Sequence, residues 1–168
     1  PEEQVFLRDT VAEFAAREPV ASAERLFDGK TVKPSRRGDV ELCFDLGEQS
    51  CGYFDFRIRA DEGTVVDLNA IEYIRADGTL QHVHAYNRNG MRYTAKQGNN
   101  RFTSLKRRSG RYLFVTLRNQ KAPVEIGSLR LIESTAPVAT AGSFRCSDAM
   151  LNRVWNMSER TLQLCMED

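Results

Sequence analysis

The stretch that decides the fold is residues 52–60, GYFDFRIRA. Apolar and polar side chains alternate through it, and successive side chains of a β-strand point to opposite faces. The apolar face of the predicted strand is formed by Phe54, Phe56, Ile58 and Ala60. Its polar face is formed by Tyr53, Asp55, Arg57 and Arg59. The pattern therefore predicts a strand with one face in a core and the other in water.

Other short apolar-rich runs share this period and are separated by turn signals about every 8 to 12 residues, which is typical of an antiparallel sandwich. The runs cover residues 40–46, 64–74, 91–95, 100–105, 111–118 and 124–134. The turn signals are Asp77-Gly78, with a hairpin strand on each side, Asn89-Gly90, Ser109-Gly110 and the region around Pro123. We expect a mainly β fold over residues 39–136, an antiparallel β-sandwich of the jelly-roll-like kind with about eight strands.

The residues before the sandwich, 1–38, lack the alternating pattern. Residues 2–17 place apolar side chains at spacings compatible with a helix, and Pro19 would stop that helix. Residues 19–38 show no sustained period. We expect 1–38 to be an extended, partly helical segment.

The residues after the sandwich, 137–168, are predicted to form a linker and an amphipathic helix. Ser147 is a favoured N-cap, and Asp148 in the first turn complements the helix dipole. One apolar stripe follows at helical spacing, formed by Leu151, Val154, Trp155, Ser158, Leu162 and Cys165. Such a stripe has to be buried against something, so we expect its partner helices to lie in sequence beyond residue 168.

Charge and hydropathy exclude several classes of function. The 168 residues carry 24 Lys and Arg against 23 Asp and Glu, a net charge of +1, so no nucleic-acid partner is expected. The densest basic cluster, 106–108, indicates a solvated turn or, alternatively, an anion site. Neither a run of 18 apolar residues nor a signal peptide is found, so no membrane partner is expected. The chain starts at Pro1, which suggests an excised piece, and bacterial cytoplasm and periplasm both stay open as its location.

Cysteine and histidine give no clear metal or cofactor site, and we predict neither. The cysteines form no C-x-x-C pair; free thiols are expected, with a Cys43–Cys51 bridge as the alternative in an oxidising compartment. His82 and His84 would share one face of a strand, which suits either two neutral histidines or a two-histidine metal site lacking a recognisable third ligand.

Sugar contact is a second reading of one hairpin loop. Tyr86, Asn87 and Arg88 combine an aromatic ring with planar amide and guanidinium groups, which can stack on sugars and hydrogen-bond to their hydroxyls. Loop composition alone also explains them. A glycosidase needs two facing carboxylates, and Glu167 and Asp168 point about 100° apart on a helix. We therefore assign no catalytic residue.

Several segments resemble bacterial α-L-rhamnosidases. The most specific cluster is residues 142–168, with GSFRCSD at 142–148, LNRVW at 151–155 and LCMED at 164–168. FDLG at 44–47 with Gly52-Tyr53, Asp77-Gly78 and GRYLFV at 110–115 are similar to the β-sandwich that precedes the catalytic domain of that family. The resemblance covers residues 39–168.

The resemblance implies a parent glycoside hydrolase that is inverting and has an (α/α)6 catalytic barrel. The acidic residues of that family follow the stretch matching Cys165 to Asp168, so the resemblance places them outside this chain. We expect a non-catalytic accessory domain, inactive alone, that supports the barrel and can shape the rim of the sugar cleft. The expected partners are the remaining parent chain, packed against the Trp155 helix, and a rhamnose-containing glycan bound through the parent. A stand-alone carbohydrate-binding or protein-interaction module is the alternative.

Overall fold

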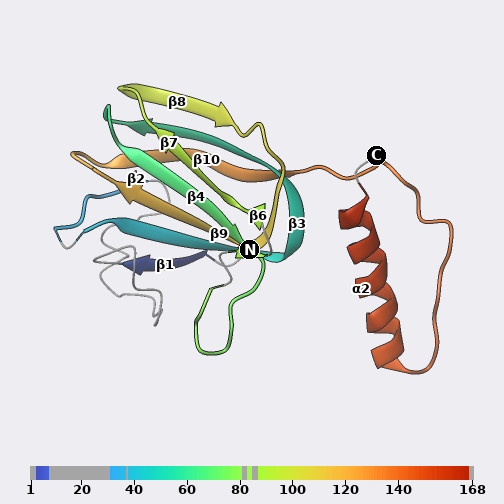
Figure 1. The fold of residues 1–168 in the computed structure, drawn as a ribbon. Helices are drawn as coiled ribbons and strands as arrows, with labels where there is room; N and C mark the ends of the chain where they lie inside the picture. Colours follow the sequence, from blue (N-terminus) through green and yellow to red (C-terminus); the bar gives the residue numbers. More distant parts are fainter. Residues whose placement is uncertain (1–2, 8–30, 37, 81–82, 85–86, 167–168) are drawn as a thin grey trace.

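The computed structural model describes residues 3–7, 31–36, 38–80, 83–84 and 87–166. The elements within these residues are β1 (Glu3–Leu7), β2 (Thr31–Val32), β3 (Val40–Ala60), β4 (Val65–Ile71), β5 (Val83–His84), β6 (Asn87–Arg88), β7 (Gly90–Thr94), β8 (Gly98–Thr103), β9 (Arg108–Arg118), β10 (Val124–Glu133) and α2 (Ala149–Cys165). Eight of these strands form one connected antiparallel sheet, and β5 pairs only with β6. Figure 1 shows the strands stacked as a sandwich, with α2 standing at one end.

The long strand β3 joins the two layers of the sandwich. Its first part, from Val40, pairs with β1 and β9, whereas its last part, to Ala60, pairs with β10 and β8. The register shifts between Asp45 and Ser50, where Gly47 takes a φ of +85°. A residue with a side chain rarely adopts that φ, so glycine permits the bend there. One layer is then β1, β3, β9, β4 and β7, and the other is β8, β3, β10 and β2.

The core lies between these layers. Phe54, Phe56, Ile58 and Ala60 of β3 are all at most 7% exposed, as their alternation predicts. The facing layer contributes Val40, Leu42, Val66, Leu68, Ala70, Leu113, Val115 and Leu117. Phe56 meets Tyr93 of β7, which is not its hydrogen-bonded neighbour, edge to face at 5.1 Å between ring centroids. Burial of each large apolar side chain stabilises the fold by about 1.5–3 kcal/mol. The predicted mainly β antiparallel sandwich with one C-terminal helix is confirmed.

The polar face of residues 52–60 contains one exception to the expected exposure. Asp55 is only 1% exposed, although Arg57 and Arg59 on the same face reach water. Its carboxylate accepts hydrogen bonds from Thr103 Oγ1 at 2.8 Å and from Arg130 Nη2 at 2.6 Å. These two bonds hold the pKa of Asp55 below its usual range despite burial. A buried carboxylate is tolerated here because it is paired.

The predicted N-terminal helix over residues 2–17 is wrong for the part that is described. Residues 3–7 form β1, which pairs with β3 from Glu3 opposite Phe44 to Leu7 opposite Val40. Pairing with a strand that is already fixed satisfies backbone groups and overrides a weak local periodicity. The rest of that prediction, residues 8–17, lies outside the described residues. Within the segment 1–38, which was expected to be extended or partly helical, Thr31–Val32 form a short strand, β2, that pairs with β10.

Of two predicted turns, one is present and the other is not. Asp77-Gly78 forms the predicted turn, with Gly78 at φ +81° and Asp77 Oδ1 accepting from the Thr79 amide, but only an isolated bridge between Ile74 and Leu80 flanks it. Ser109-Gly110 was expected to be a turn and instead lies inside β9. A Cβ atom on Gly110 would stand 2.8 Å from Ala70 Cβ, so this glycine serves close packing of β9 on β4.

The N-cap of the C-terminal helix α2 lies one residue later than predicted. Asp148 rather than Ser147 is the N-cap, because its Oδ1 accepts from the amides of Met150 and Leu151. The helix ends at Cys165, with Met166 as C-cap. Among the described helices, none combines the length and apolar character needed to cross a membrane.

Candidate functional site

The candidate site is the junction where α2 meets the end of the sandwich. Arg160 of α2 reaches the last residue of β10, Glu133, with Nη1 donating to Oε1 at 3.0 Å and Nη2 donating to Oε2 at 2.6 Å. Arg160 Nη2 also donates to the Gln49 carbonyl oxygen at 3.3 Å and lies 3.2 Å from a Glu48 carboxylate oxygen. The bend of β3 and the end of β10 thus form a cradle for one guanidinium group.

Glu133 is held ionised by the same contacts. Ser50 Oγ donates to its Oε2 at 2.6 Å, the oxygen that also accepts from Arg160 Nη2. The hydrogen bonds from Arg160 and then Ser50 outweigh burial and lower the pKa of Glu133 to about 2. The Arg160–Glu133 pair therefore stays charged at every pH near neutrality.

A second arginine ties the last turn of α2 to the sandwich. Arg107 Nη2 donates to the Ser134 carbonyl oxygen at 2.8 Å and to the Leu164 carbonyl oxygen at 3.1 Å. A cation at this point satisfies a helix-end carbonyl and complements the negative end of the helix dipole. The basic cluster 106–108 is therefore not only the solvated turn we expected. Arg108 also lies partly buried, 5.8 Å from the ring centroid of Phe54.

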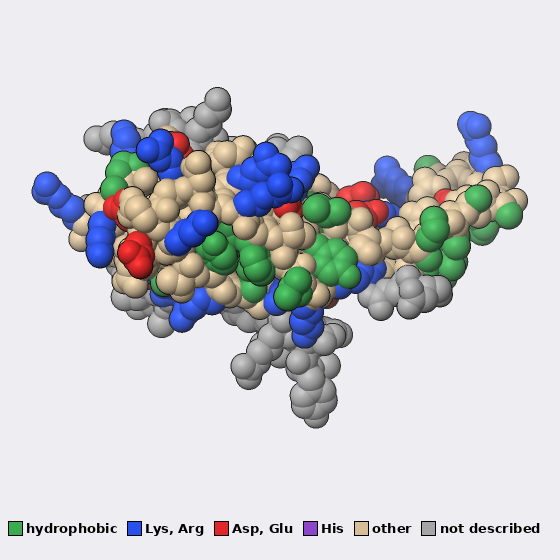
Figure 2. Space-filling view, turned by 90° about the horizontal axis from the view of Figure 1, so that it is seen from above, with side chains coloured by type: hydrophobic (Ala, Val, Ile, Leu, Met, Phe, Trp, Pro, Cys, Tyr) green, Lys and Arg blue, Asp and Glu red, His purple; other side chains and the backbone are tan. Residues whose placement is uncertain are grey.

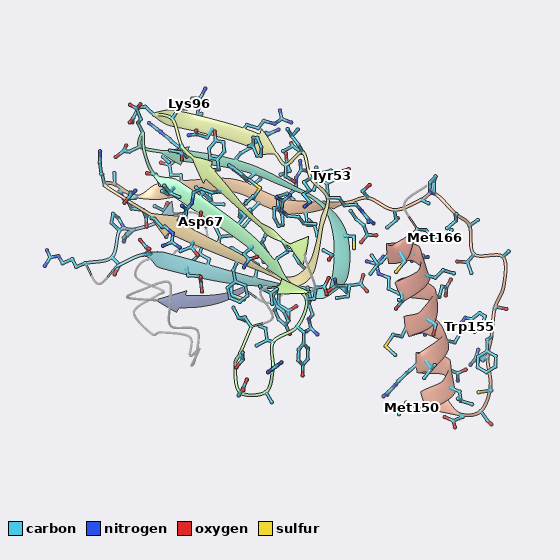
Figure 3. All side chains as sticks on the ribbon, viewed as in Figure 1. Tyr53, Asp67, Lys96, Met150, Trp155 and Met166 are labelled. Atoms are coloured by element: carbon cyan, nitrogen blue, oxygen red, sulfur yellow. The ribbon has the colours of Figure 1, made fainter. Side chains whose placement is uncertain are left out.

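The linker between β10 and α2 is fastened to the helix at both ends. The Ala136 amide donates to the Met166 carbonyl oxygen at 3.0 Å. At the other end, Asn152 bonds the backbone of Cys146 twice, at 2.9 and 2.8 Å. Between these points Trp155 packs against Phe144 of the linker, with ring centroids 5.6 Å apart. Linker and helix therefore form one unit at the end of the sandwich (Figure 3).

Two grooves flank α2. One, of about 420 Å³, lies between linker and helix and is lined mainly by Val138, Ala141, Trp155, Leu162 and Met166. The other, of about 620 Å³, lies between helix and sandwich and includes Gln49, Cys51, Met157, Arg160 and Cys165. The four cysteines are free thiols; Cys43 is the buried one, and Cys51 and Cys165 face the second groove.

The contact of α2 with the sandwich is polar, and most of its apolar side chains are exposed. Leu164 is the buried residue of the helix, at 7% exposure. By contrast, Trp155 is 38% exposed and Leu162 is 63% exposed. Met150, Leu151, Val154 and Met157 are also exposed. Figure 2 shows hydrophobic side chains on the surface of this end of the molecule. The two arginines thus position a helix whose apolar face remains uncovered.

The residues predicted to contact sugar are not brought into this junction by the described structure. Tyr86 lies outside the described residues. Asn87 and Arg88 form β6, with Asn87 opposite His84 and Arg88 opposite Val83. His82 also lies outside the described residues, and within those that are described no cluster of three metal-ligating side chains occurs.

The fold and this junction define a class: an antiparallel β-sandwich domain carrying a helix with an uncovered apolar face. The particular family follows from comparison of sequences. The model of the bacterial alpha-L-rhamnosidase concanavalin-like domain matches residues 35–132, more than half of the chain. The chain belongs to this family. A search of curated proteins returned no significant match.

Solved structures agree with this assignment. The GH78 family rhamnosidase of Bacillus sp. GL1 is similar over 82% of this chain, with 40% sequence identity and a TM-score of 0.74. A rhamnosidase from Klebsiella oxytoca, solved with rhamnose bound, is similar over 99% of the chain at 16% identity and a TM-score of 0.70, which shows a shared fold. The present chain spans 14% and 34% of the lengths of these two proteins.

Proposed function

We propose that this chain is the non-catalytic sandwich portion of an α-L-rhamnosidase and that it holds the first helix of the catalytic domain in place. In this proposal residues 1–38 are an N-terminal segment, 39–136 the accessory sandwich and 137–168 the linker and first catalytic-domain helix. The remaining parent chain packs on the Trp155 helix, and a rhamnose-containing glycan binds through the parent.

The observation that carries the proposal is the pairing of a fixed helix with an uncovered apolar face. Arg160 and Arg107 fix the position of α2 on the sandwich through ion pairs and carbonyl contacts. Its apolar side chains, among them Leu151 and Leu162, stay in water. Each forgoes about 1.5–3 kcal/mol relative to burial, which a covering set of helices would supply.

The test compares one double substitution in two contexts. Leu151→Gln with Leu162→Gln is made in the 168-residue chain and in the full parent protein, and thermal unfolding is followed. We expect little change in the chain, where both side chains are exposed, and a fall of several degrees in the parent, where they would be buried. Arg153→Gln, also on an exposed helix position, is the control and should be neutral in both. Equal effects of the double substitution in both contexts would contradict the proposal.

Three further measurements, of activity and of glycan binding, complete the test. The purified 168-residue chain should not hydrolyse an aryl α-L-rhamnoside above a mock preparation. Specific binding of a glycan by this chain alone, kept after removal of residues 147–168, would instead favour a stand-alone carbohydrate-binding module. A role of Tyr86, Asn87 and Arg88 in sugar contact stays a proposal; Asn87→Ala with Arg88→Ala in the parent should raise KM for a rhamnoside if they form part of the cleft rim.

A further inference from the structure

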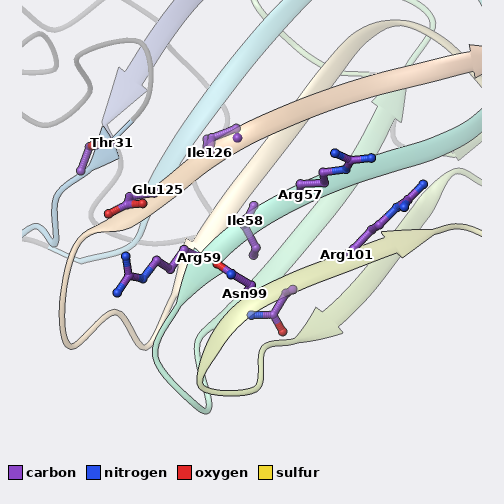
Figure 4. Close-up of a pocket in the computed structure, with 10 residues that line it drawn as sticks. Thr31, Arg57, Ile58, Arg59, Asn99, Arg101, Glu125 and Ile126 are labelled. Atoms are coloured by element: carbon purple, nitrogen blue, oxygen red, sulfur yellow. The ribbon is translucent and has the colours of Figure 1, made fainter.

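The outer face of the layer formed by β8, β3 and β10 carries an unusual arrangement of charge. Its central row places Arg101 of β8 directly opposite Arg57 of β3. The next row places Asn99, Arg59 and Glu125 side by side on the three strands. These residues, with Thr31 of β2, line a groove of about 640 Å³ (Figure 4).

Three arginines of this groove form no close ion pair with the described residues. Arg57, Arg59 and Arg101 are exposed, and in the part of the chain that the structure describes none forms an ion pair. The neighbouring row differs, because Arg130 is neutralised by Asp55. This face carries four guanidinium groups and two carboxylates, an excess of two positive charges. The guanidinium groups are those of Arg57, Arg59, Arg101 and Arg130, and the carboxylates are those of Asp55 and Glu125.

The Arg57–Arg101 pair is unfavourable by itself. Residues directly opposite on antiparallel strands have Cα atoms about 4.5–5.5 Å apart, and like charges there destabilise the sheet. Figure 4 shows the two side chains extending side by side from β3 and β8. An anion placed between them would remove the repulsion and accept hydrogen bonds from both guanidinium groups. A carboxylate fits, because guanidinium forks match its two oxygens.

We propose that this groove binds an acidic oligosaccharide, with a uronate carboxylate between Arg57 and Arg101. Asn99 and Thr31 supply amide and hydroxyl groups for sugar hydroxyls, and Arg59 extends the positive surface along the strand. The groove lies at the end of the sandwich away from α2, so a glycan held there leaves the junction free (Figure 1). A nucleic acid is disfavoured, since the chain has a net charge of only +1 and the groove lining contains no aromatic side chain for base stacking.

The test is a calorimetric titration of the 168-residue chain with trigalacturonate, a neutral trisaccharide and a short single-stranded oligodeoxynucleotide. We expect trigalacturonate to bind at least about tenfold more tightly than the neutral sugar, and more weakly as salt is raised. Arg57→Thr with Arg101→Thr should reduce the affinity by about tenfold or more. Arg57→Lys with Arg101→Lys keeps both charges but loses the forks, so its affinity should be intermediate.

The matched control removes two positive charges elsewhere. Arg75→Thr with Lys121→Thr changes exposed residues outside the groove and should leave trigalacturonate binding unchanged. Misfolding cannot account for a loss in the groove variant if its melting temperature is unchanged or raised, as relief of the Arg57–Arg101 repulsion requires. Three outcomes would overturn the proposal. They are absence of trigalacturonate binding, an equal loss of affinity in the Arg57→Thr/Arg101→Thr variant and the Arg75→Thr/Lys121→Thr control, and equally tight binding of the oligonucleotide.

Discussion

Arg160 on the C-terminal helix and Glu133 at the end of β10 form a two-pronged ion pair, with N···O distances of 3.0 and 2.6 Å. Arg160 is 26% exposed and Glu133 39% exposed, so water screens the pair partly. Its contribution is therefore modest in energy, about 1 kcal/mol. Its value is geometric, because it joins the side of α2 to the strand from which the linker departs.

Arg160→Met should loosen the helix without unfolding the sandwich. We expect 15N relaxation of the α2 amides to show faster motion than that of the β3 amides, whereas in the unsubstituted chain both tumble together. Arg153→Met, at an exposed helix position, is the matched control and should leave α2 rigid. An α2 that tumbles with the sandwich in the Arg160 variant would show that other contacts are sufficient to dock it.

Docking of α2 should also depend on pH. The pKa of Glu133 is about 2 in the folded chain against an ordinary value of 4.5, so the folded state binds the proton less readily than the unfolded state. The stabilisation is complete above about pH 4.5 and is lost as the pH falls toward 2. The same relaxation measurement across this window should show α2 loosening, and Glu133→Gln should remove most of that dependence. A pH profile identical in the two proteins would argue against this role of Glu133.

Gly52→Ala should disrupt the sandwich. A Cβ atom there would stand 1.9 Å from the Ile132 carbonyl oxygen, in a strand that is hydrogen-bonded on both sides. The cost should reach about 3 kcal/mol or prevent folding, as overpacking of a rigid backbone does. Gly142→Ala is the control, because its Cβ would meet nothing within 4 Å. Urea unfolding measures both; similar midpoints would refute the expected clash.

Asp55→Asn should destabilise the fold by about 1–2 kcal/mol. The amide can keep a contact with Thr103 but loses the charge that Arg130 pairs with, while Arg130 itself can still reach water. A double-mutant cycle with Arg130→Met isolates the pair. A coupling energy near zero would mean that Thr103 and burial alone explain the position of Asp55.

The elements predicted best from the sequence are those in which the burial of one face produces a periodic pattern of apolar residues. Residues 52–60 and 64–70 alternate because one face of each is in the core, and α2 shows helical spacing with a nearby cap. β1 was missed because its conformation depends on pairing with β3. Ser109-Gly110 was wrongly predicted to be a turn. A glycine is needed there because β4 packs closely against it, and the local sequence contains no sign of that contact.

The junction could not be found from the sequence. Arg160 and Glu133 are 27 residues apart, and Arg107 and Leu164 are 57 apart, so their contacts depend on the completed fold. Arg107 even lies in a cluster that resembles an ordinary solvated turn. What the sequence did report was the uncovered stripe of α2, because a helical repeat is visible without knowledge of its neighbours. The sugar-contact residues 86–88 stay a prediction.

The strand β3 also constrains how the chain can fold during synthesis. It pairs with four other strands. Its last part pairs with β10, where Arg59 lies opposite Glu125, so that layer cannot form until β10 has been synthesised. Loop closure over such sequence separations is slow, and an unpaired strand edge invites association with other chains. The 21 residues of β3 are among the first of the sandwich to leave the ribosome and among the last to gain all their partners. The nascent sandwich is therefore most vulnerable to aggregation before β10 is complete.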